Sequence, residues 1–136
     1  SMCYGYSLAI PPGWDAPFRQ AVYQFGEGAS LSSPDRLVKV GVSAAYTPVD
    51  QFAPIESGLH LQSNEYLLVG PTAITRDGRP GFFSYISQVS PSHVSLSYFY
   101  RQAPDRYVGI TIFLFPPFDM VRASEARALV ESLKFK

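Results

Sequence analysis

The sequence lacks most of the residue types and patterns on which metal, nucleic-acid and membrane functions depend. Its 136 residues include one cysteine and two histidines, so no internal disulfide can form and no zinc-ligand spacing is present. Eleven basic residues are matched by eleven acidic ones, whereas proteins that bind nucleic acid through its phosphates normally carry a basic excess. No apolar run approaches the ~18 residues of a membrane-spanning helix. We therefore expect no zinc site, no nucleic-acid partner and no transmembrane segment.

Signatures of the common enzyme classes are missing as well. A serine hydrolase needs a nucleophile, a base and a carboxylate, but there is no Gly-x-Ser-x-Gly elbow, and nothing marks His60 or His93 as a base. Gly26-Glu27-Gly28 lacks the third glycine and the lysine of a phosphate loop, and we expect a turn there instead. The six aspartates fall singly in predicted turns and are explained by turn and cap chemistry. We predict a protein that is not an enzyme, with no catalytic residues, metal or cofactor.

The start of the chain leaves two interpretations open. Ser1-Met2 resembles residues left by cloning, and we exclude these two residues from the fold. Cys3 is either the lipid-modified first residue of a mature bacterial lipoprotein or an incidental terminal thiol. Lipoproteins usually keep a flexible tether after that cysteine, whereas here a strand pattern starts at Tyr4. The second interpretation is therefore the default.

Aromatic residues are what the sequence has in excess, at 15% of the chain against 16% charged residues. This composition excludes a disordered tail, and the length predicts a single domain over residues 1–136. Alternation of apolar and polar residues predicts strands. The expected strands are 4–10, 21–25, 38–44, 65–75, 82–89, 93–101 and 107–115.

Turn and breaker residues separate these strands. Asp77-Gly78 predicts a type I′ hairpin turn, because both central positions of that turn need positive φ. We expect a loop at 30–36, and the prolines of 47–63 exclude a long helix there. The strand at 107–115 is apolar on both faces, which indicates a central strand covered on both sides.

The C-terminal segment predicts a helix. Asp119 can cap a helix that runs to about Leu133. Ala126, Leu129, Val130 and Leu133 form one apolar stripe that should pack on the sheet, with Glu125, Arg127 and Glu131 facing water. The predicted fold class is α+β, with an antiparallel sheet of about six or seven strands and a C-terminal helix packed on it.

The order of these signals resembles the PsbP-like superfamily. The resemblance rests on the Pro-Pro-Gly-Trp turn of 10–14, the Gly-Arg-Pro-Gly of 78–81 before the aromatic strand start at 82–85, and the helix end at 130–135. The superfamily also holds a nuclear Ran-binding factor, DcrB-type envelope lipoproteins and Eag-type chaperones of type VI secretion. The resemblance implies an antiparallel sheet with flanking helices and a binding function without catalysis. Members often carry a helix where this chain has the proline-broken segment 47–63.

Aromatic residues lie on both faces of several strands, so a second element must cover the other face or an aromatic patch is exposed. Arginines outnumber lysines eight to three, and arginine and aromatic residues are typical of protein interfaces. Two predicted turns combine them. The candidate partner-binding residues are Arg76, Arg79, Tyr100, Arg101, Asp105, Arg106 and Tyr107.

The resulting hypothesis is a bacterial protein-binding module linked to secretion or the envelope. Its most concrete form is a periplasmic immunity protein, lipid-anchored if Cys3 is modified, that neutralises a type VI secretion effector through a rigid arginine-rich surface. One alternative is an Eag-type cytoplasmic effector chaperone, a homodimer with an apolar groove for a helix. Another is an envelope protein that binds a small hydrophobic ligand between sheet and helix.

Overall fold

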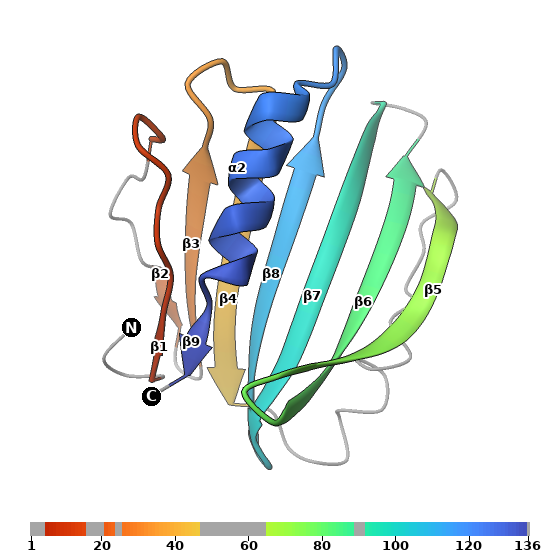
Figure 1. Ribbon diagram of the computed structural model, residues 1–136. Coiled ribbons are helices and arrows are strands. Elements are labelled where there is room, and N and C mark those ends of the chain that lie inside the picture. Colours follow the sequence, from red (N-terminus) through yellow and green to blue (C-terminus); the bar gives the residue numbers. More distant parts are fainter. Residues whose placement is uncertain (1–4, 16–20, 24–25, 47–64, 89–91, 136) are drawn as a thin grey trace.

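A seven-stranded antiparallel sheet dominates the computed structural model, which describes residues 5–15, 21–23, 26–46, 65–88 and 92–135. The strand order is β2-β3-β4-β8-β7-β6-β5 (Figure 1). The strands are β2 (Ala21–Tyr23), β3 (Gly26–Ser32), β4 (Val38–Tyr46), β5 (Glu65–Arg76), β6 (Arg79–Gln88), β7 (His93–Ala103) and β8 (Arg106–Leu114). With the helix described next, this confirms the predicted α+β class.

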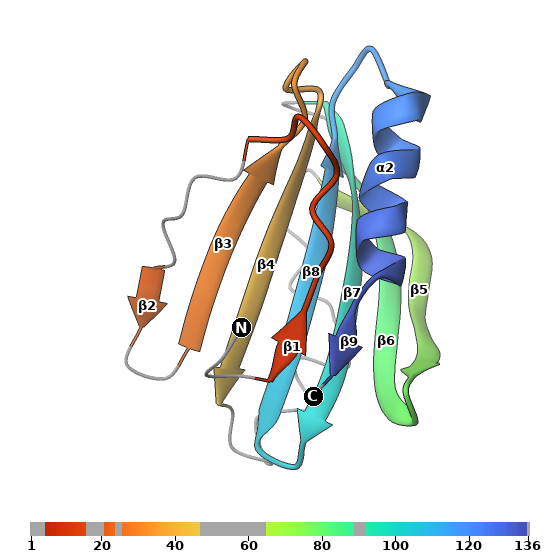
Figure 2. The same ribbon diagram turned by 60° about the vertical axis from the view of Figure 1, so that its left-hand side comes forward.

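The described chain has one helix, α2 (Met120–Glu131), which lies across one face of the sheet over β4 and β8 (Figures 1 and 2). A short ribbon of β1 (Tyr6–Ser7) and β9 (Lys134–Phe135) lies on the same side. The predicted stripe of α2 is buried there. The core consists of Tyr6, Trp14, Leu31, Val38, Val40, Val42, Ala44, Tyr100, Val108, Ile110, Ile112, Ala126, Leu129, Val130 and Leu133.

Strand β8 is the central strand of the sheet, as its apolar pattern predicts, but the described helix covers only one of its two faces. Its even-numbered residues face α2, and all of Val108, Ile110 and Ile112 are buried. They pair across the sheet with alternate residues of β4 and β7, so that Val40, Ile112 and Leu96 share one row. On the opposite face Phe113 is half-buried. Fully burying a valine or isoleucine side chain contributes about 1.5–3 kcal/mol. The row that contains Val40 and Ile112 is therefore a main source of stability.

Two predicted boundaries in the N-terminal half are wrong. Residues 26–32 form β3, whereas we expected a turn at Gly26-Glu27-Gly28 and a loop from residue 30. The antiparallel pairing with β4 runs in register from Gly26↔Ala45 to Ser32↔Lys39, and it outweighs the weak strand preference of glycine and serine. The first strand is also shorter than predicted, because β1 pairs with only two residues of β9.

Local signals in the C-terminal half are confirmed. Asp77 and Gly78 have φ angles of 50° and 73°, as the predicted hairpin turn requires. Asp119 has extended backbone angles and caps α2 by accepting a hydrogen bond from the Arg122 amide at 3.1 Å. Glu125 differs from expectation: instead of facing water, it binds two side chains, Trp14 and Arg122.

Several predictions fall outside the described residues. These concern Ser1-Met2, Cys3, His60 and the segment 47–63. Within the described ranges, no helix combines the length and the apolar character needed to cross a membrane.

Candidate binding groove

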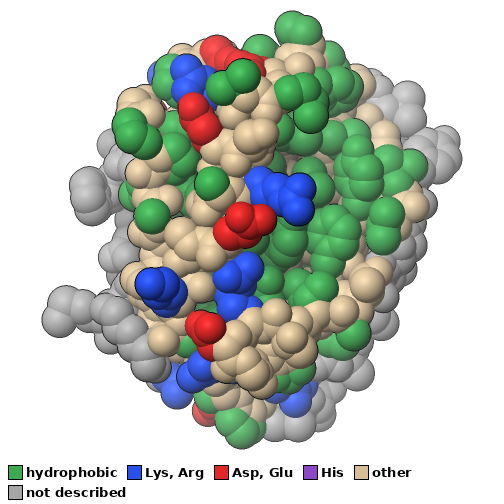
Figure 3. Space-filling model, in the orientation of Figure 1, with side chains coloured by type: hydrophobic (Ala, Val, Ile, Leu, Met, Phe, Trp, Pro, Cys, Tyr) green, Lys and Arg blue, Asp and Glu red, His purple; other side chains and the backbone are tan. Residues whose placement is uncertain are grey.

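An apolar groove of about 550 Å³ runs beside α2 on the helix-bearing face of the sheet. Figure 3 shows hydrophobic side chains gathered there, next to the helix and over β7, β6 and β5, with charged side chains along the helix side. The groove is lined by Ile74, Phe83, Leu96, Tyr98, Ile112, Leu114, Met120, Ala123, Ser124 and Arg127. Its floor therefore comes from β6, β7 and β8, one wall from α2 and the other from β5.

Strand register explains why this surface is apolar. Phe83 pairs with Tyr98, which pairs with Ile110, and the neighbouring row places Leu96 beside Ile112. Every second residue of these strands thus points to the face that carries α2. The Phe83 and Tyr98 rings lie 4.9 Å apart between centroids at an angle of 42°, a favourable aromatic arrangement.

The groove exists because one helix is too narrow for the sheet. Neighbouring strands are spaced by ~4.8 Å, so seven strands span roughly 30 Å. A helix with its side chains is only ~10–12 Å across. Since α2 lies over β4 and β8, the same face of β7, β6 and β5 has no described helix above it. The strip that no described helix covers is about as wide as a second helix.

The two ends of the groove differ. At the end nearer the β5–β6 hairpin, the Arg76 guanidinium donates from Nη1 to the Glu131 carbonyl oxygen at 2.9 Å and ties β5 to the end of α2. At the other end Met120, in the first turn of α2, is 70% exposed, and Phe118 and Val121 nearby are also exposed. The described residues at the Met120 end are thus apolar and exposed.

Three of the predicted partner-binding residues meet around Phe135 of β9. The Arg79 guanidinium lies 4.7 Å from the centre of the Phe135 ring, and the Tyr100 ring lies 6.1 Å from it. Arg76 lies over the Tyr100 ring at 5.8 Å. Tyr100 is only 3% exposed, so it packs in the core and offers no surface to a partner. The two arginines hold the hairpin against β9 and α2.

The other four predicted residues lie at the neighbouring β7–β8 turn. The two turns are adjacent, because Arg79 Nε donates to the Gln102 carbonyl oxygen at 3.3 Å. Arg101 pairs with Tyr107 across the strands, and the Arg106 and Asp105 charged groups are 4.0 Å apart. Burial raises the pKa of Tyr107. That this turn contacts a partner stays a prediction.

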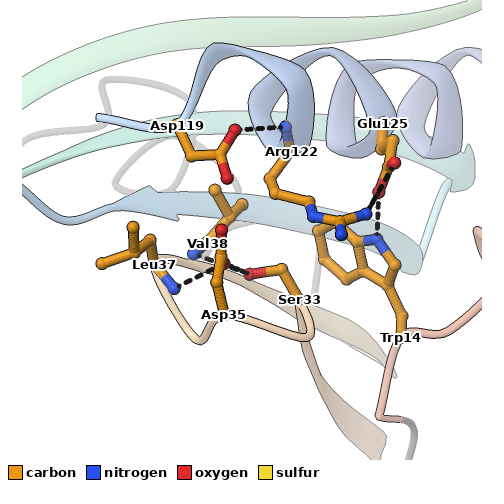
Figure 4. A network of polar contacts seen from close by, with 8 residues as sticks. All are labelled: Trp14, Ser33, Asp35, Leu37, Val38, Asp119, Arg122 and Glu125. Atoms are coloured by element: carbon orange, nitrogen blue, oxygen red, sulfur yellow. Dashed lines mark hydrogen bonds and ion pairs between the residues drawn. The ribbon is translucent and has the colours of Figure 1, made fainter. Parts of the chain in front are cut away.

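A polar network fixes the N-terminal end of α2 to the sheet (Figure 4). The Trp14 indole donates to Glu125 Oε2 at 2.6 Å, and Arg122 donates to both oxygens of the same carboxylate at 2.8 and 2.9 Å. These bonds lower the pKa of Glu125 below its ordinary value, with the Trp14 bond as the largest cause. The network places Met120 and Ala123 along the groove.

The β3–β4 turn supplies the other half of this network. Asp35 accepts hydrogen bonds from the Ser33 hydroxyl at 2.6 Å and the Leu37 amide at 3.1 Å (Figure 4). A hydrogen bond with the Asp119 side chain, followed by these two bonds, lowers the pKa of Asp35 to about 2. An ionised carboxylate only accepts hydrogen bonds, so at neutral pH the Ser33 hydroxyl and the Leu37 amide are the donors that hold Asp35 in this turn.

The described residues show no constellation that marks a reaction. His93 lies at the start of β7 with its ring 5.4 Å from that of Phe115 and 6.0 Å from that of Phe113. No group of three or more histidine, cysteine, aspartate or glutamate residues is placed to hold a metal ion in the described ranges. Among the described residues, the groove is a surface feature with the shape and apolar lining of a binding site.

The sequence offered an apolar groove or a pocket between sheet and helix only as alternatives, and it did not name the lining residues. The strand residues of the groove follow ordinary alternation, which we interpreted as core, and its α2 residues lie outside the apolar stripe that we predicted. The available signal was the excess of aromatic residues beside a single predicted helix, which indicated incomplete coverage of the sheet.

Comparison with known proteins shows which solved structures share this architecture. No protein-family model matches the sequence, and no curated protein matches it. Among solved structures, cyanobacterial PsbP (CyanoP) from Synechocystis is similar at 12% identity and a TM-score of 0.70, covering 100% of this chain and 89% of that one. A protein from Bacteroides thetaiotaomicron is similar at 11% identity and a TM-score of 0.55, over 96% of this chain and 45% of that one. At these identities the likeness concerns the fold.

Proposed function

With the PsbP-like fold as the premise, we propose that this chain is a non-enzymatic binding module that holds an apolar segment of another protein in the groove beside α2. The single observation that carries the proposal is the apolar groove of about 550 Å³ over β5–β8, which no described helix covers. Exposed apolar surface of this kind typically marks a binding site. A strip one helix wide beside an existing helix suits helix-in-groove recognition.

The groove favours one version of the predicted function over the others. Shielding an exported effector before secretion needs an apolar groove, whereas the immunity function that the sequence placed first needs a rigid arginine-rich surface. Arg76 and Arg79 already make contacts within the chain, which weakens the support for that surface. We therefore propose an effector chaperone, which would act in the cytoplasm, and keep periplasmic neutralisation of an effector as the alternative.

A matched pair of substitutions tests the role of the groove. Met120 and Val121 are consecutive residues of α2, exposed by 70% and 68%, but only Met120 lines the groove. Met120→Glu and Val121→Glu therefore introduce the same charge at nearly the same place. Capture of a stoichiometric partner from the source cell should fall about tenfold for Met120→Glu and stay near the wild-type level for Val121→Glu.

Two outcomes would contradict the proposal. One is equal capture by both variants, which would place the partner elsewhere. The other is the absence of a protein partner together with a hydrophobic small molecule that co-purifies and raises Tm, which would favour the ligand-binding alternative. A captured effector separates the two protein-binding versions: an immunity protein abolishes its activity, and a chaperone leaves that activity unchanged.

A further inference from the structure

One charged side chain lines the groove. Of its ten lining residues, seven are aliphatic or aromatic hydrocarbons or methionine, two carry hydroxyls, and only Arg127 is charged. Arg127 lies on the α2 wall and its side chain is 76% exposed. A partner that fills the groove therefore lies beside Arg127.

Among the described residues, Arg127 forms a weak ion pair on its own helix. Its Nε lies 3.3 Å from Glu131 Oε1, one turn further along α2, and the Glu131 side chain is 61% exposed. Exposed pairs of this spacing contribute little, because water screens both charges. Arg127 can therefore leave Glu131 for another carboxylate at a small cost in free energy.

A partner that covers the groove removes water that accepts hydrogen bonds from Arg127. A guanidinium has five N–H donors and no acceptor, and a partner segment that displaces water leaves most of them to be satisfied. Removing a charge from water without new acceptors is strongly unfavourable. Two parallel hydrogen bonds from a guanidinium to a carboxylate satisfy this need best.

We propose that the partner segment carries an aspartate or glutamate whose carboxylate binds Arg127 while its apolar residues fill the groove. This inference rests on the proposed function and names the chemistry of the partner. The segment is an apolar helix with an acidic residue on the edge that faces α2.

Tyr98 supports the same chemistry. Its ring forms part of the groove floor, and burial raises the pKa of its hydroxyl, with Arg127 and Glu131 both near enough to act on it. A phenol with an ordinary pKa of 10.0 is protonated at neutral pH, so the Tyr98 hydroxyl can donate to a carboxylate in the groove. Ser124 adds a second hydroxyl on the helix wall.

A pair of peptides tests the proposal on the full chain. Both are amphipathic helical peptides of about 18 residues with leucines at i, i+3, i+4 and i+7. One carries a single glutamate at the edge of the apolar face, and the other carries glutamine there. Fluorescence anisotropy should give a Kd about tenfold lower for the glutamate peptide at low salt, a preference that high salt reduces.

Variants assign the preference to Arg127. Arg127→Gln should remove it, and Arg127→Glu should reverse it in favour of a lysine peptide. Glu131→Gln removes the competing carboxylate and should strengthen binding of the glutamate peptide. Arg36→Gln is the matched control, because Arg36 is 72% exposed in the β3–β4 turn and does not line the groove. It should leave the preference unchanged.

The outcomes separate this inference from the proposed function. Equal binding of both peptides, weakened for both by Met120→Glu, would overturn the acidic partner and leave the groove function standing. No binding of either peptide would overturn both. A concentration-dependent dimer that Met120→Glu dissociates would assign the groove to a second copy of the chain, and would also overturn the inference.

Discussion

Glu125 joins segments that are far apart in the sequence. Its carboxylate accepts the Trp14 indole N–H and both bonds from Arg122. Trp14 is 7% exposed and is the single tryptophan of the chain. A helix residue that the pattern assigned to water is thus the acceptor that fixes the N-terminal segment on α2.

The lowered pKa of Glu125 predicts how stability depends on pH. Because its pKa in the folded chain is below the ordinary value of 4.5, its contribution is present above that pH and is lost as pH falls through the folded-state pKa. Asp35 acts in the same direction at lower pH, toward its pKa of about 2. Wild-type Tm should fall on acidification, and Trp14 fluorescence should change with it.

Substitution isolates the part that belongs to Glu125. Glu125→Gln keeps an oxygen for the Trp14 indole but loses the charge, so Tm should be lower at pH 7 and should vary less between about pH 5 and 3. Glu131→Gln is the control with the same change of charge on the same helix, and its pH profile should follow the wild type. A Glu125→Gln profile parallel to the wild type would contradict the assignment.

At the scale of the element, α2 depends on residues outside it for both ends. It has no acidic residue in its first turn and no basic residue in its last turn. The Asp119 side chain caps its start, and Arg76 from β5 donates to the Glu131 carbonyl oxygen at its end. These groups supply the charges that normally compensate the helix dipole.

Removing the cap should therefore destabilise the whole protein. Asp119→Ala leaves the Arg122 amide without its acceptor and should lower the free energy of unfolding by about 0.5–2 kcal/mol, measured by urea unfolding. Asp119→Asn keeps a capping oxygen and should lose less. Equal losses in the two variants would contradict the cap as the source of the effect.

At the scale of the whole molecule, the β1–β9 ribbon closes the structure. Tyr6 pairs with Phe135 and Ser7 with Lys134. Ala9 donates to the Ser132 hydroxyl at 2.8 Å, and Gln102 donates to the Gly5 carbonyl oxygen at 3.0 Å. All these contacts hold residues 5–9 against later parts of the chain.

This closure predicts an asymmetric kinetic effect. Pairing across almost the entire chain needs the sheet to form first, because loop closure opposes it until then. Phe135→Ala should therefore accelerate unfolding, about tenfold for each 1.4 kcal/mol lost, with little change in the refolding rate. Stopped-flow fluorescence of Trp14 measures both rates. Val40→Ala, in the centre of the sheet, should also slow refolding; equally slowed refolding in Phe135→Ala would contradict the late closure.

Local chemistry explains which features could be predicted from the sequence. Asp77-Gly78 forms a turn and Asp119 caps a helix through contacts with residues next to them in the sequence. The alternation of residues in β8 reflects which side chains are buried. Strand β3 could not be predicted, because glycine and serine become strand only through pairing with β4. The groove depends on where α2 crosses the sheet, and the bond from Trp14 to Glu125 depends on residues 111 positions apart. No local pattern encodes either of them.

The uncovered strip beside α2 also affects heat capacity. Apolar surface that stays in water in the folded chain contributes similarly to the heat capacity of the folded and unfolded states, so it adds little to the change on unfolding. The same surface loses its water when a partner covers it, and that step carries a negative heat-capacity change. Part of the hydrophobic driving force in this sequence is thus not used in folding, and it remains for association.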